Sequence, residues 1–453
     1  MELSKNLSRV FNFILPWSDF LYILQQEEYN TRRYLKWLLK FFWRRNIQIR
    51  DRLKYTARAK LIFVASVGLW LISLRGIWFY LQTREQVLLL FVWLILIPLF
   101  VLAGNTLVLP VHKIVRVRAV NRAENKVAKQ KSLKIIGIAG SFGKTTTKNF
   151  IYELVRYNFR TQMLPGNVNT TLGIAAWIEN SLQPATELLI VEMDAYDEGE
   201  IKASCKVAPP DIAIIMNVGD QHLERFRSKV KLAKTLKEIF LYAKPNAALF
   251  STRETYNLVG PIPAPERWFA VGDKITYLSP ADLPQLSDSN YTNAVFAATV
   301  AEFLNIPQKF IVDTLKKVEP PERRQKISLV YGYECIDDSY NISFTTAQAG
   351  INTASSLARE KNKKLLVVMA GIPELGPEES DKNIVLGEIL GTKADQTAIL
   401  KSKFASDLIQ GIKNRQKYTL FGNLSEFIEN APKKFPPQEW VLLLEPELTD
   451  LYY

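Results

Sequence analysis

Cysteine and histidine are nearly absent from this chain of 453 residues, which contains two of each. Cys205 and Cys335 are too few for a disulfide framework, and their spacing does not match that of a zinc site. A reducing compartment is therefore the expected location. The two histidines, His112 and His222, are isolated in the sequence. Internal repeats and low-complexity tracts are also missing, so the chain is expected to form a few ordinary domains.

A general excess of basic residues is also missing, although the net charge is +13. Residues 31–60 carry a charge of +10 and residues 111–134 carry +7, which leaves −4 for the rest of the chain. The basic residues therefore flank one apolar region and are not spread over the remaining sequence. This placement excludes a nucleic-acid-binding body and is typical of contact with anionic lipid headgroups.

Two long apolar runs lie between the basic segments. Residues 87–111 contain no charged side chain and are long enough to span a bilayer. Residues 60–84 form a weaker candidate because Arg75 interrupts them, although an arginine near the end of a span can reach the headgroups. The alternative for this second run is a helix lying on the membrane surface. The short connection predicts a two-helix membrane hairpin with both basic flanks on the same side.

The positive flanks predict the orientation of this hairpin. Lysine and arginine accumulate on the cytoplasmic side of membrane proteins, so both termini and the remaining domains are expected in the cytoplasm. The expected location is the cytoplasmic membrane, with a multi-pass anchor and membrane lipid as a partner. Residues 32–45 mix cations with Trp and Phe at helical spacing, which fits an interfacial helix or, alternatively, a buried helix of a small N-terminal domain.

The sequence pattern changes at Leu133, where apolar strands begin to alternate with amphipathic helices. This alternation predicts two mainly parallel α/β sheets. Two prolines after a helix-like segment ending at Val318 suggest a boundary between them. The expected strands lie within 134–139, 187–194, 211–218, 334–340, 364–371 and 396–400. The expected divisions are a basic N-terminal region 1–59, a hairpin 60–111, a basic juxtamembrane linker 112–132, a central domain 133–318 and a C-terminal domain 319–453.

The segment GIAGSFGKTTTKNF (137–150) predicts a phosphate-binding loop between a buried strand and a helix over 145–155. Gly140 and Gly143 allow backbone N–H groups to close on phosphate oxygens, with help from the helix N-terminus. Lys144 supplies a positive charge, and the hydroxyl of Thr145 can bind Mg²⁺. The strict P-loop pattern fails at its first glycine, which falls on Ile138, so the alternative is a glycine-rich turn beside an unrelated lysine.

Two further residues follow neighbouring predicted strands. Glu192 lies at the end of ELLIVE, where a carboxylate beside a phosphate loop is well placed to hold Mg²⁺. Asp194, Asp197 and Glu198 are better explained as ordinary loop acids. His222 follows the strand DIAIIMNV, but a lone histidine is more often structural than a metal ligand.

The order of the motifs resembles that of the Mur ligases, and within them the D-alanyl-D-alanine-adding branch of peptidoglycan precursor synthesis. The resemblance covers about residues 133 to 390. It rests on the segments GIAGSFGKTTTK, PGNVNTTLGI, VEMDAYDEGEI, MNVGDQHLERFRS, SNYTNAVFAA, PPERRQ, CIDDSYNIS and IPELG, in that order.

The resemblance implies an ATP-dependent ligase with a P-loop central ATPase domain and a Rossmann-like C-terminal domain. In this family an acceptor carboxylate attacks the γ-phosphate of ATP, and an amino acid or dipeptide amine then displaces phosphate from the acyl phosphate. The implied nucleotide-binding residues are Gly140, Ser141, Gly143, Lys144, Thr145, Thr146, Asn293, Arg323 and Asp338. Thr145 and Glu192 would hold one Mg²⁺, and His222 would help hold a second. Lys144, His222, Arg323 and Asp338 would act in catalysis.

Several positions depart from the family pattern. The family's carbamylated lysine falls on Leu236, with Lys237 one position away and Lys234 on nearly the opposite helix face. Glu322 replaces the usual glycine before the arginine, and Asn383 stands where a histidine is expected. The sequence DDSYNISF replaces the family's DDSYNANP, and the C-terminal tail lacks its lysine-glycine-serine signature. These departures leave a catalytically silent membrane scaffold or partner subunit as the alternative to an enzyme.

The N-terminal region is the largest departure, because family members bind the UDP part of their substrate there with a globular domain. The hairpin occupies that place in this sequence. The acceptor is therefore expected to be a carboxylate-bearing glycan peptide, either linked to a nucleotide or, with a slight preference, linked to a lipid. The sequence does not identify the acceptor or the amine donor.

Overall fold

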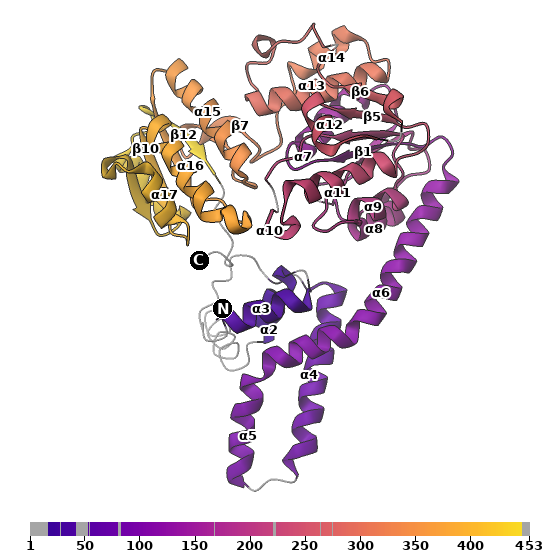
Figure 1. Cartoon of the computed structure of the whole chain (residues 1–453), viewed down its shortest axis with the longest axis vertical. Helices are drawn as coiled ribbons and strands as arrows, with labels where there is room; N and C mark the ends of the chain where they lie inside the picture. The colour runs from indigo at the N-terminus through magenta and orange to yellow at the C-terminus, as the bar shows by residue number, and fades with distance from the viewer. Residues whose placement is uncertain are drawn as a thin grey trace. The chain divides into compact units, whose positions relative to one another are not determined.

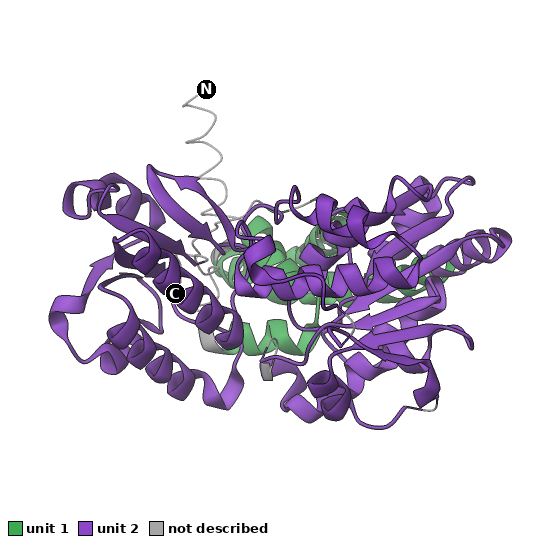
Figure 2. Ribbon diagram, turned by 90° about the horizontal axis from the view of Figure 1, so that it is seen from above, with its two compact units in different colours: residues 1–118 green, residues 119–453 purple. Residues whose placement is uncertain are grey.

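The computed structural model describes residues 17–27, 29–41, 53, 55–79, 83–166, 168–220, 223–262, 264–273 and 275–445. The chain divides into two compact units, residues 1–118 and 119–453 (Figure 2). The division falls within the long helix α6, Ile97–Lys129. The finer domain limits expected from the sequence stay predictions.

Unit 1 is entirely helical in its described part. It contains α2 (Trp17–Gln26), α3 (Thr31–Phe41), α4 (Ala57–Trp78), α5 (Thr83–Ile95) and the first part of α6. An apolar core joins α2 and α3 to α4 and α6, with Tyr34 and Leu38 of α3 buried in it. The described part of the segment 32–45 therefore has one buried face, as in a small N-terminal domain.

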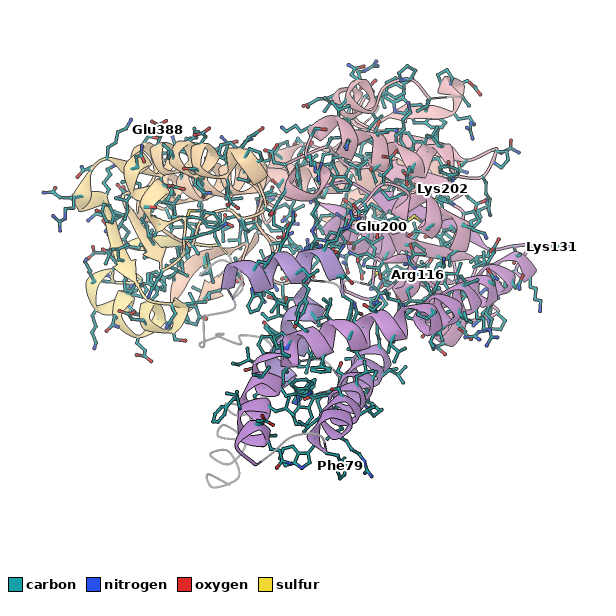
Figure 3. All side chains as sticks on the ribbon, turned by 60° about the horizontal axis from the view of Figure 1, so that its bottom comes forward. Phe79, Arg116, Lys131, Glu200, Lys202 and Glu388 are labelled. Carbon is teal, nitrogen blue, oxygen red and sulfur yellow. The ribbon has the colours of Figure 1, made fainter. Side chains whose placement is uncertain are left out.

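Helices α4 and α5 lie side by side as a helical hairpin (Figure 1). The indole N–H of Trp70 donates to the carbonyl of Trp93 at 3.1 Å, and the indole N–H of Trp93 donates to Ser73 Oγ at 2.9 Å. These bonds satisfy the two part-buried indole N–H groups. Phe79, at the end of α4, is 75% exposed near the tip of the hairpin (Figure 3).

The apolar run 87–111 is not one helix, which corrects the prediction of a single span. Helix α5 ends at Ile95 and α6 begins at Ile97, because Pro98 lacks the N–H group that a continuous helix needs. Helix α6 then continues to Lys129 and includes most of the expected juxtamembrane linker. In the described part of the chain, Ala57–Gly76 and Ile97–Lys129 are long and apolar enough to cross a membrane, and only 17% and 33% of their apolar windows are buried.

Unit 2 contains two six-stranded sheets. The first is parallel throughout, with the order β2-β3-β1-β4-β5-β6. Both faces are buried: Ile135 and Leu189 pack against α8, α9 and α11, while Ile136 and Ile190 pack against α7, α13 and α14. This double burial explains the continuous apolar runs in the sequence. The strands are β1 (Lys134–Ala139), β2 (Thr161–Met163), β3 (Leu188–Glu192), β4 (Ile212–Ile215), β5 (Ala248–Ser251) and β6 (Trp268–Ala270).

The helices around the first sheet supply most of the site described below. The phosphate-loop helix α7 packs most extensively against α13. The helices are α7 (Lys144–Val155), α8 (Thr171–Ser181), α9 (Glu200–Val207), α10 (Leu223–Phe226), α11 (Lys229–Leu241), α12 (Arg253–Val259), α13 (Asp288–Phe303) and α14 (Gln308–Leu315).

The second sheet is mixed, with the order β11-β10-β9-β12-β8-β7. Its edge strand β7 pairs antiparallel with β8, and the other pairs are parallel. The strands are β7 (Lys326–Val330), β8 (Tyr333–Asp337), β9 (Lys364–Met369), β10 (Gln396–Leu400), β11 (Tyr418–Phe421) and β12 (Trp440–Leu444). The helices are α15 (Phe344–Glu360), α16 (Glu379–Lys393), α17 (Ala405–Ile412) and α18 (Leu424–Lys434).

The prediction of two mainly parallel α/β sheets is confirmed. The six expected strands all form, and two of them, β1 and β10, have the expected bounds. The sequence pattern gave no indication of the antiparallel edge strand β7. This strand is only half-buried, so it lacks the apolar run that identifies the central strands.

Candidate functional site

The phosphate loop lies between the C-terminal end of β1 and the start of α7, as the sequence predicts. Gly140 and Gly143 have φ angles of 140° and 81°, which only glycine adopts without strain. No side chain caps the N-terminus of α7, so its first-turn N–H groups are available to an anion. This geometry is that of a phosphate site.

The loop is held in shape by the segment that follows β4. The N–H of Phe142 donates to Asn217 Oδ1 at 3.1 Å, and Asn217 Nδ2 donates back to the carbonyl of Phe142 at 3.0 Å. The N–H of Gly219 donates to Ser141 Oγ at 2.8 Å. Sequence reasoning did not single out Asn217. Its position directly after a buried strand, at the edge where β1 also ends, was the available signal.

The side chains at the start of α7 meet two acids at the C-terminal end of β3, Glu192 within the strand and Asp194 after it. Lys144 Nζ donates to the carbonyl of Gly140 at 2.5 Å and lies 3.4 Å from Asp194 Oδ1. Thr145 Oγ1 donates to Glu192 Oε2 at 2.9 Å. Asn169 Nδ2 donates to Glu192 Oε1 at 3.2 Å. The predicted residues Lys144, Thr145 and Glu192 are therefore together, and all three are buried.

Lys148 is a second lysine on α7 and was not predicted. Its amino group lies 3.3 Å from Glu192 Oε2 and donates to the carbonyl of Gly166 at 3.0 Å. Burial lowers the pKa of Lys148, and the nearby Glu192 carboxylate opposes that shift. A buried Glu192 carboxylate thus has a countercharge within the fold.

Asn293 of α13 lies against the phosphate loop. A Cβ atom added at Gly143 would stand 2.4 Å from Asn293 Oδ1, so only glycine fits beside this amide. Asn293 Nδ2 donates to Asn290 Oδ1 at 3.2 Å. Asn290 Nδ2 in turn donates to the carbonyl of Arg324 at 3.0 Å. These bonds connect the first sheet's helices to the segment that leads into the second sheet.

Asp338 approaches the same region from the end of β8. Its Oδ2 accepts a hydrogen bond from Gln325 Nε2 at 2.9 Å, and Gln325 Oε1 accepts one from Ser287 Oγ at 2.8 Å. The helix α13 and the strand β8 are therefore bridged through Gln325. Gln325 is the last residue of the motif PPERRQ. The motif was noted in the sequence, but no role was predicted for the glutamine.

These side chains surround one cavity of about 350 Å³. Its wall combines residues of both sheets, so neither α/β half forms it alone. From the first half it is lined by Ser141, Phe142, Gly143, Lys144, Thr145, Thr146, Asn169, Asp194, Tyr196, Met216, Asn217, Ser289, Asn290, Thr292, Asn293 and Phe296. From the second half it is lined by Arg324, Gln325, Asp338, Tyr340, Asn341, Ile342, Ser343 and Thr346.

Comparison with known proteins relates this arrangement to one family. Residues 138–258 match the Mur ligase middle domain. The chain is 25% identical over 327 residues to the UDP-N-acetylmuramoyl-tripeptide–D-alanyl-D-alanine ligase of Bacillus subtilis, covering 66% of this chain and 71% of that protein. The chain is therefore similar to the Mur ligases, and residues 138–258 correspond to their middle domain.

Solved structures share the fold of this chain. MurF from Acinetobacter baumannii matches with a TM-score of 0.63 and 22% identity, covering 73% of this chain and 77% of that one. MurF from Thermotoga maritima, solved in complex with ADP, matches with a TM-score of 0.62 and 22% identity, covering 73% and 80%. At this level of identity the likeness establishes the Mur ligase fold, with its parallel sheet and its second, mixed sheet.

The two adjacent arginines, Arg323 and Arg324, differ in position. Arg324 lines the cavity, with its guanidinium 4.0 Å from the ring centroid of Tyr340. Arg323, the predicted nucleotide-binding arginine, does not line it. Its Nε donates to Ser339 Oγ at 2.8 Å and its Nη2 to the carbonyl of Ser339 at 2.5 Å, so it braces the turn after β8. The role predicted for Arg323 stays a prediction.

We expect replacement of Arg324 with alanine to raise the KM for ATP at least about tenfold, because the cavity loses its cation over Tyr340. Arg323→Ala is the matched control and should change that KM by less than about threefold. Steady-state kinetics at saturating acceptor and amine would measure both. A larger rise in the KM for ATP in Arg323→Ala than in Arg324→Ala would support Arg323 as the nucleotide-binding arginine.

The positions implied for a second metal are only partly described. His222 lies outside the described residues. Leu236, at the position of the family's carbamylated lysine, is buried in the apolar core of the first sheet. Lys234 is largely exposed and pairs with Glu198 at 2.7 Å, and Lys237 does not line the cavity. Whether Lys234 or Lys237 takes the role of the family's carbamylated lysine stays undecided.

Thr145 and Glu192, the two other residues predicted to hold metal, fit one Mg²⁺. Thr145 Oγ1 and Glu192 Oε2 lie 2.9 Å apart, and Mg²⁺ favours such hydroxyl and carboxylate oxygens together with water and phosphate oxygens. In the part of the chain that the structure describes, no three or more His, Cys, Asp or Glu side chains form a metal-binding group. A metal held by two protein oxygens and a nucleotide agrees with both observations.

A buried carboxyl pair lies at the ends of β8 and β12. These strands run parallel, and the N–H of Asp338 donates to the carbonyl of Leu444, the residue before Glu445, at 2.9 Å. Glu445 is 1% exposed, and neither carboxyl oxygen has a hydrogen-bond partner among the described residues. Burial raises the pKa of Asp338 to about 7 and raises the pKa of Glu445 well above its usual range.

These raised pKa values predict how stability depends on pH. The folded protein retains protons that the unfolded chain releases above about pH 4.5, so the free energy of unfolding should fall as pH rises. In wild type, Glu445 should lower the free energy of unfolding by about 1 kcal/mol per pH unit between pH 5 and 7. Glu445→Gln should abolish this contribution. Urea unfolding of the full chain would measure it, with the exposed Glu429→Gln as control. Equal pH slopes for wild type and Glu445→Gln would contradict the expectation.

Proposed function

We propose that this chain couples a carboxylate-bearing acceptor to an amine and converts ATP to ADP and phosphate, in the synthesis of a cell-wall precursor. The observation that carries the proposal is the shared cavity of the two α/β halves. The phosphate loop, Asp194 after β3, Asn293 and Asp338 all line it, and Glu192 accepts a hydrogen bond from the lining residue Thr145. A site built from two halves suits a reaction whose reactive intermediate must be shielded from water.

The nucleotide would bind across this cavity. Backbone groups of Gly140, Ser141, Gly143 and Thr146 would surround its phosphates, and Lys144 would neutralise the β- and γ-phosphates. Asn293, Asp338 and an arginine of the segment 323–324 would contact the rest of the nucleotide. Thr145 and Glu192 would hold Mg²⁺, and His222 would help to hold a second ion. Bound Mg²⁺ supplies charge neutralisation at the transferred phosphoryl group.

The chemistry would proceed in two displacements. An acceptor carboxylate oxygen attacks the γ-phosphorus, and the bond to ADP breaks. The amine nitrogen then attacks the acyl carbon, loses a proton, and phosphate leaves with the oxygen that had carried the phosphoryl group. Both steps move negative charge, so the cations and fixed donors around the cavity are better suited to them than a strong base would be.

The acceptor is proposed in two forms. The names of the curated relatives describe a UDP-linked muramoyl tripeptide joined to D-alanyl-D-alanine, so a nucleotide-linked peptide and a dipeptide amine are the first candidates. A lipid-linked glycan peptide is the second. The apolar helices of unit 1, which are candidates for membrane spans, favour it because they would keep the catalytic unit at a membrane.

The ligase proposal is tested by stoichiometry. Purified full-length protein with Mg-ATP should release ADP and phosphate only when both acceptor and amine are present, and the product mass should equal their sum minus water. UDP-muramoyl tripeptide and a lipid-linked equivalent would be compared as acceptors, with D-alanyl-D-alanine as amine. ATP hydrolysis without either partner would instead indicate a simple ATPase.

A catalytically silent scaffold is the second candidate function. It is favoured by the buried Leu236 at the lysine position of the family and by the fact that Lys234 and Lys237 are not among the described residues that line the cavity. The two candidates differ in one measurement. A scaffold would form no product with any acceptor pool, whether or not it binds Mg-ADP. An enzyme would increase the mass of an acceptor by the mass of the amine minus water.

The membrane proposal concerns unit 1. Helices α4, α5 and α6 would anchor the protein in the cytoplasmic membrane, with both termini and the catalytic unit in the cytoplasm. Large apolar side chains are exposed along them, which water does not favour. These include Leu61, Phe63, Val64, Leu71, Ile72, Phe79, Leu88, Phe91, Val92, Ile95, Leu99, Leu107 and Leu109.

Thiol labelling tests this orientation. Cys205 and Cys335 are buried, and burial raises the pKa of the Cys205 thiol to about 12, so background labelling should be low. Phe79→Cys, at the hairpin tip, should react in intact cells with a membrane-impermeant maleimide. Lys131→Cys should react only after lysis. Both residues are labelled in Figure 3. Equal labelling of both in intact cells would reject the orientation.

A further inference from the structure

Lys148 combines deep burial with two acceptors that belong to different parts of the chain. Its side chain is 1% exposed, and a buried lysine is rare unless it is paired. One acceptor is the Glu192 carboxylate at the end of β3, at 3.3 Å. The other is the carbonyl of Gly166, at 3.0 Å, in the turn between β2 and α8. The predicted nucleotide site does not use this lysine.

The turn that Lys148 contacts is part of the cavity wall. We call the described residues 164–166 and 168–170 the Gly166 turn. Gly166 has a φ of 45°, and Asn169 lines the cavity. Asn169 Nδ2 donates to Glu192 Oε1 at 3.2 Å, and the carbonyl of Asn169 accepts from the N–H of Asp194 at 3.0 Å. Asn169 therefore joins the turn directly to Glu192 and Asp194. Lys148, on α7, bonds both the turn and Glu192.

The carboxylate of Glu192 has different donors on its two oxygens. Oε2 accepts from Thr145 and Lys148, both on α7, while Oε1 accepts from Asn169 of the Gly166 turn. A change in the position of Glu192 must therefore move the turn or break a buried bond, and a broken bond to a buried charge is costly. The arrangement couples the phosphate-loop helix to the turn through one carboxylate.

We propose that Lys148 is a positioning residue that holds the Gly166 turn and the Glu192 carboxylate as one unit, so that binding of a Mg-nucleotide at Thr145 and Glu192 orders the turn. The coupling to the nucleotide rests on the proposed function. The tie between Lys148 and the turn does not, because it consists of the hydrogen bonds that Lys148 makes within the fold. The two parts can therefore fail separately.

Hydrogen exchange of the full-length protein tests both parts. Without ligand, Lys148→Met should speed amide exchange in residues 164–171 by at least about tenfold, because the turn loses its anchor on α7. Exchange in residues 150–155 of α7 should stay within about twofold, which separates a local effect from unfolding of the helix. Asn149→Ala is the matched control, since Asn149 bonds only its own helix, to the carbonyl of Thr145, in the described structure.

The nucleotide arm uses Mg-ADP as the probe. In wild type it should slow exchange in residues 164–171 at least about threefold, and in Lys148→Met it should not. Titration calorimetry should show that Mg²⁺ increases ADP affinity less in the variant, while Mg-free ADP affinity is unchanged. A wild type that binds no Mg-ADP would reject the proposed function, and the ligand-free comparison would still decide the role of Lys148.

One further variant separates the loss of the turn contact from misfolding caused by an unpaired buried charge. Lys148→Met leaves Glu192 buried without its countercharge, so the combined Lys148→Met and Glu192→Gln variant removes both charges. Its turn should still exchange faster than in wild type, because the bond to the Gly166 carbonyl is lost. Wild-type exchange rates in residues 164–171 of either variant would overturn the proposal.

Discussion

Lys144→Ala should lower kcat by at least about a thousandfold while the protein remains folded. The Lys144 amino group lies beside the Gly140 carbonyl and 3.4 Å from Asp194, at the mouth of the uncapped helix α7. It is the cation placed to neutralise phosphate charge as the acyl phosphate forms. Its removal takes away stabilisation that exists mainly in the transition state, so kcat should fall more than the KM for ATP rises.

The control for this experiment is Lys206→Ala. Lys206 is exposed and pairs with Glu124 at 3.6 Å on the surface, so its loss should change the rate by less than about twofold. Circular dichroism would check that Lys144→Ala is folded, and product formation would be followed by mass. A Lys144→Ala variant with wild-type turnover would remove the phosphate loop from the reaction and with it the proposed mechanism.

Glu192→Gln should reduce kcat/KM by about a hundredfold or more and raise the Mg²⁺ concentration for half-maximal rate at least about tenfold. Glu192 is the buried carboxylate beside Thr145, so an amide in its place would bind Mg²⁺ much more weakly. The change also leaves Lys148 buried without its countercharge. Such uncompensated burial costs roughly 3–5 kcal/mol of stability, so the measurement should be made well below the melting temperature.

The matched control for Glu192→Gln is Asp197→Asn. Asp197 follows the same strand but is exposed, and it does not line the cavity. Its replacement should leave the Mg²⁺ dependence unchanged. If Glu192→Gln and Asp197→Asn showed the same Mg²⁺ dependence as wild type, Glu192 would not be a metal ligand in this protein.

The central strands and the phosphate loop could be predicted because their signals are local. The run KIIGIA forms a strand buried on both faces, and the glycines that follow take backbone angles that other residues avoid. The position of Glu192 also followed from the sequence, because parallel strands end at a common edge. The helix break at Pro98 was equally local, but the uncharged run 87–111 concealed it.

Other site residues could not be predicted because they depend on contacts between distant segments. Lys148 pairs with a glutamate 44 positions away, and Gln325 joins Ser287 to Asp338. The choice between Arg323 and Arg324 depends on the backbone of one turn, which points neighbouring side chains in different directions. Nothing in the motif PPERRQ distinguishes the two arginines.

The sequence by itself determined the likeness to the Mur ligases, the order of the strands along the chain, the phosphate loop and the apolar helices, because each depends on neighbouring residues or on a fixed spacing. The tertiary structure alone decided which charges are buried and with what partners. It brought Lys148 to Glu192, and it placed Glu445 beside Asp338 with no hydrogen-bond donor among the residues that the structure describes. The energy of a buried charge depends on all the groups around it, and these come from segments whose proximity only the folded chain establishes.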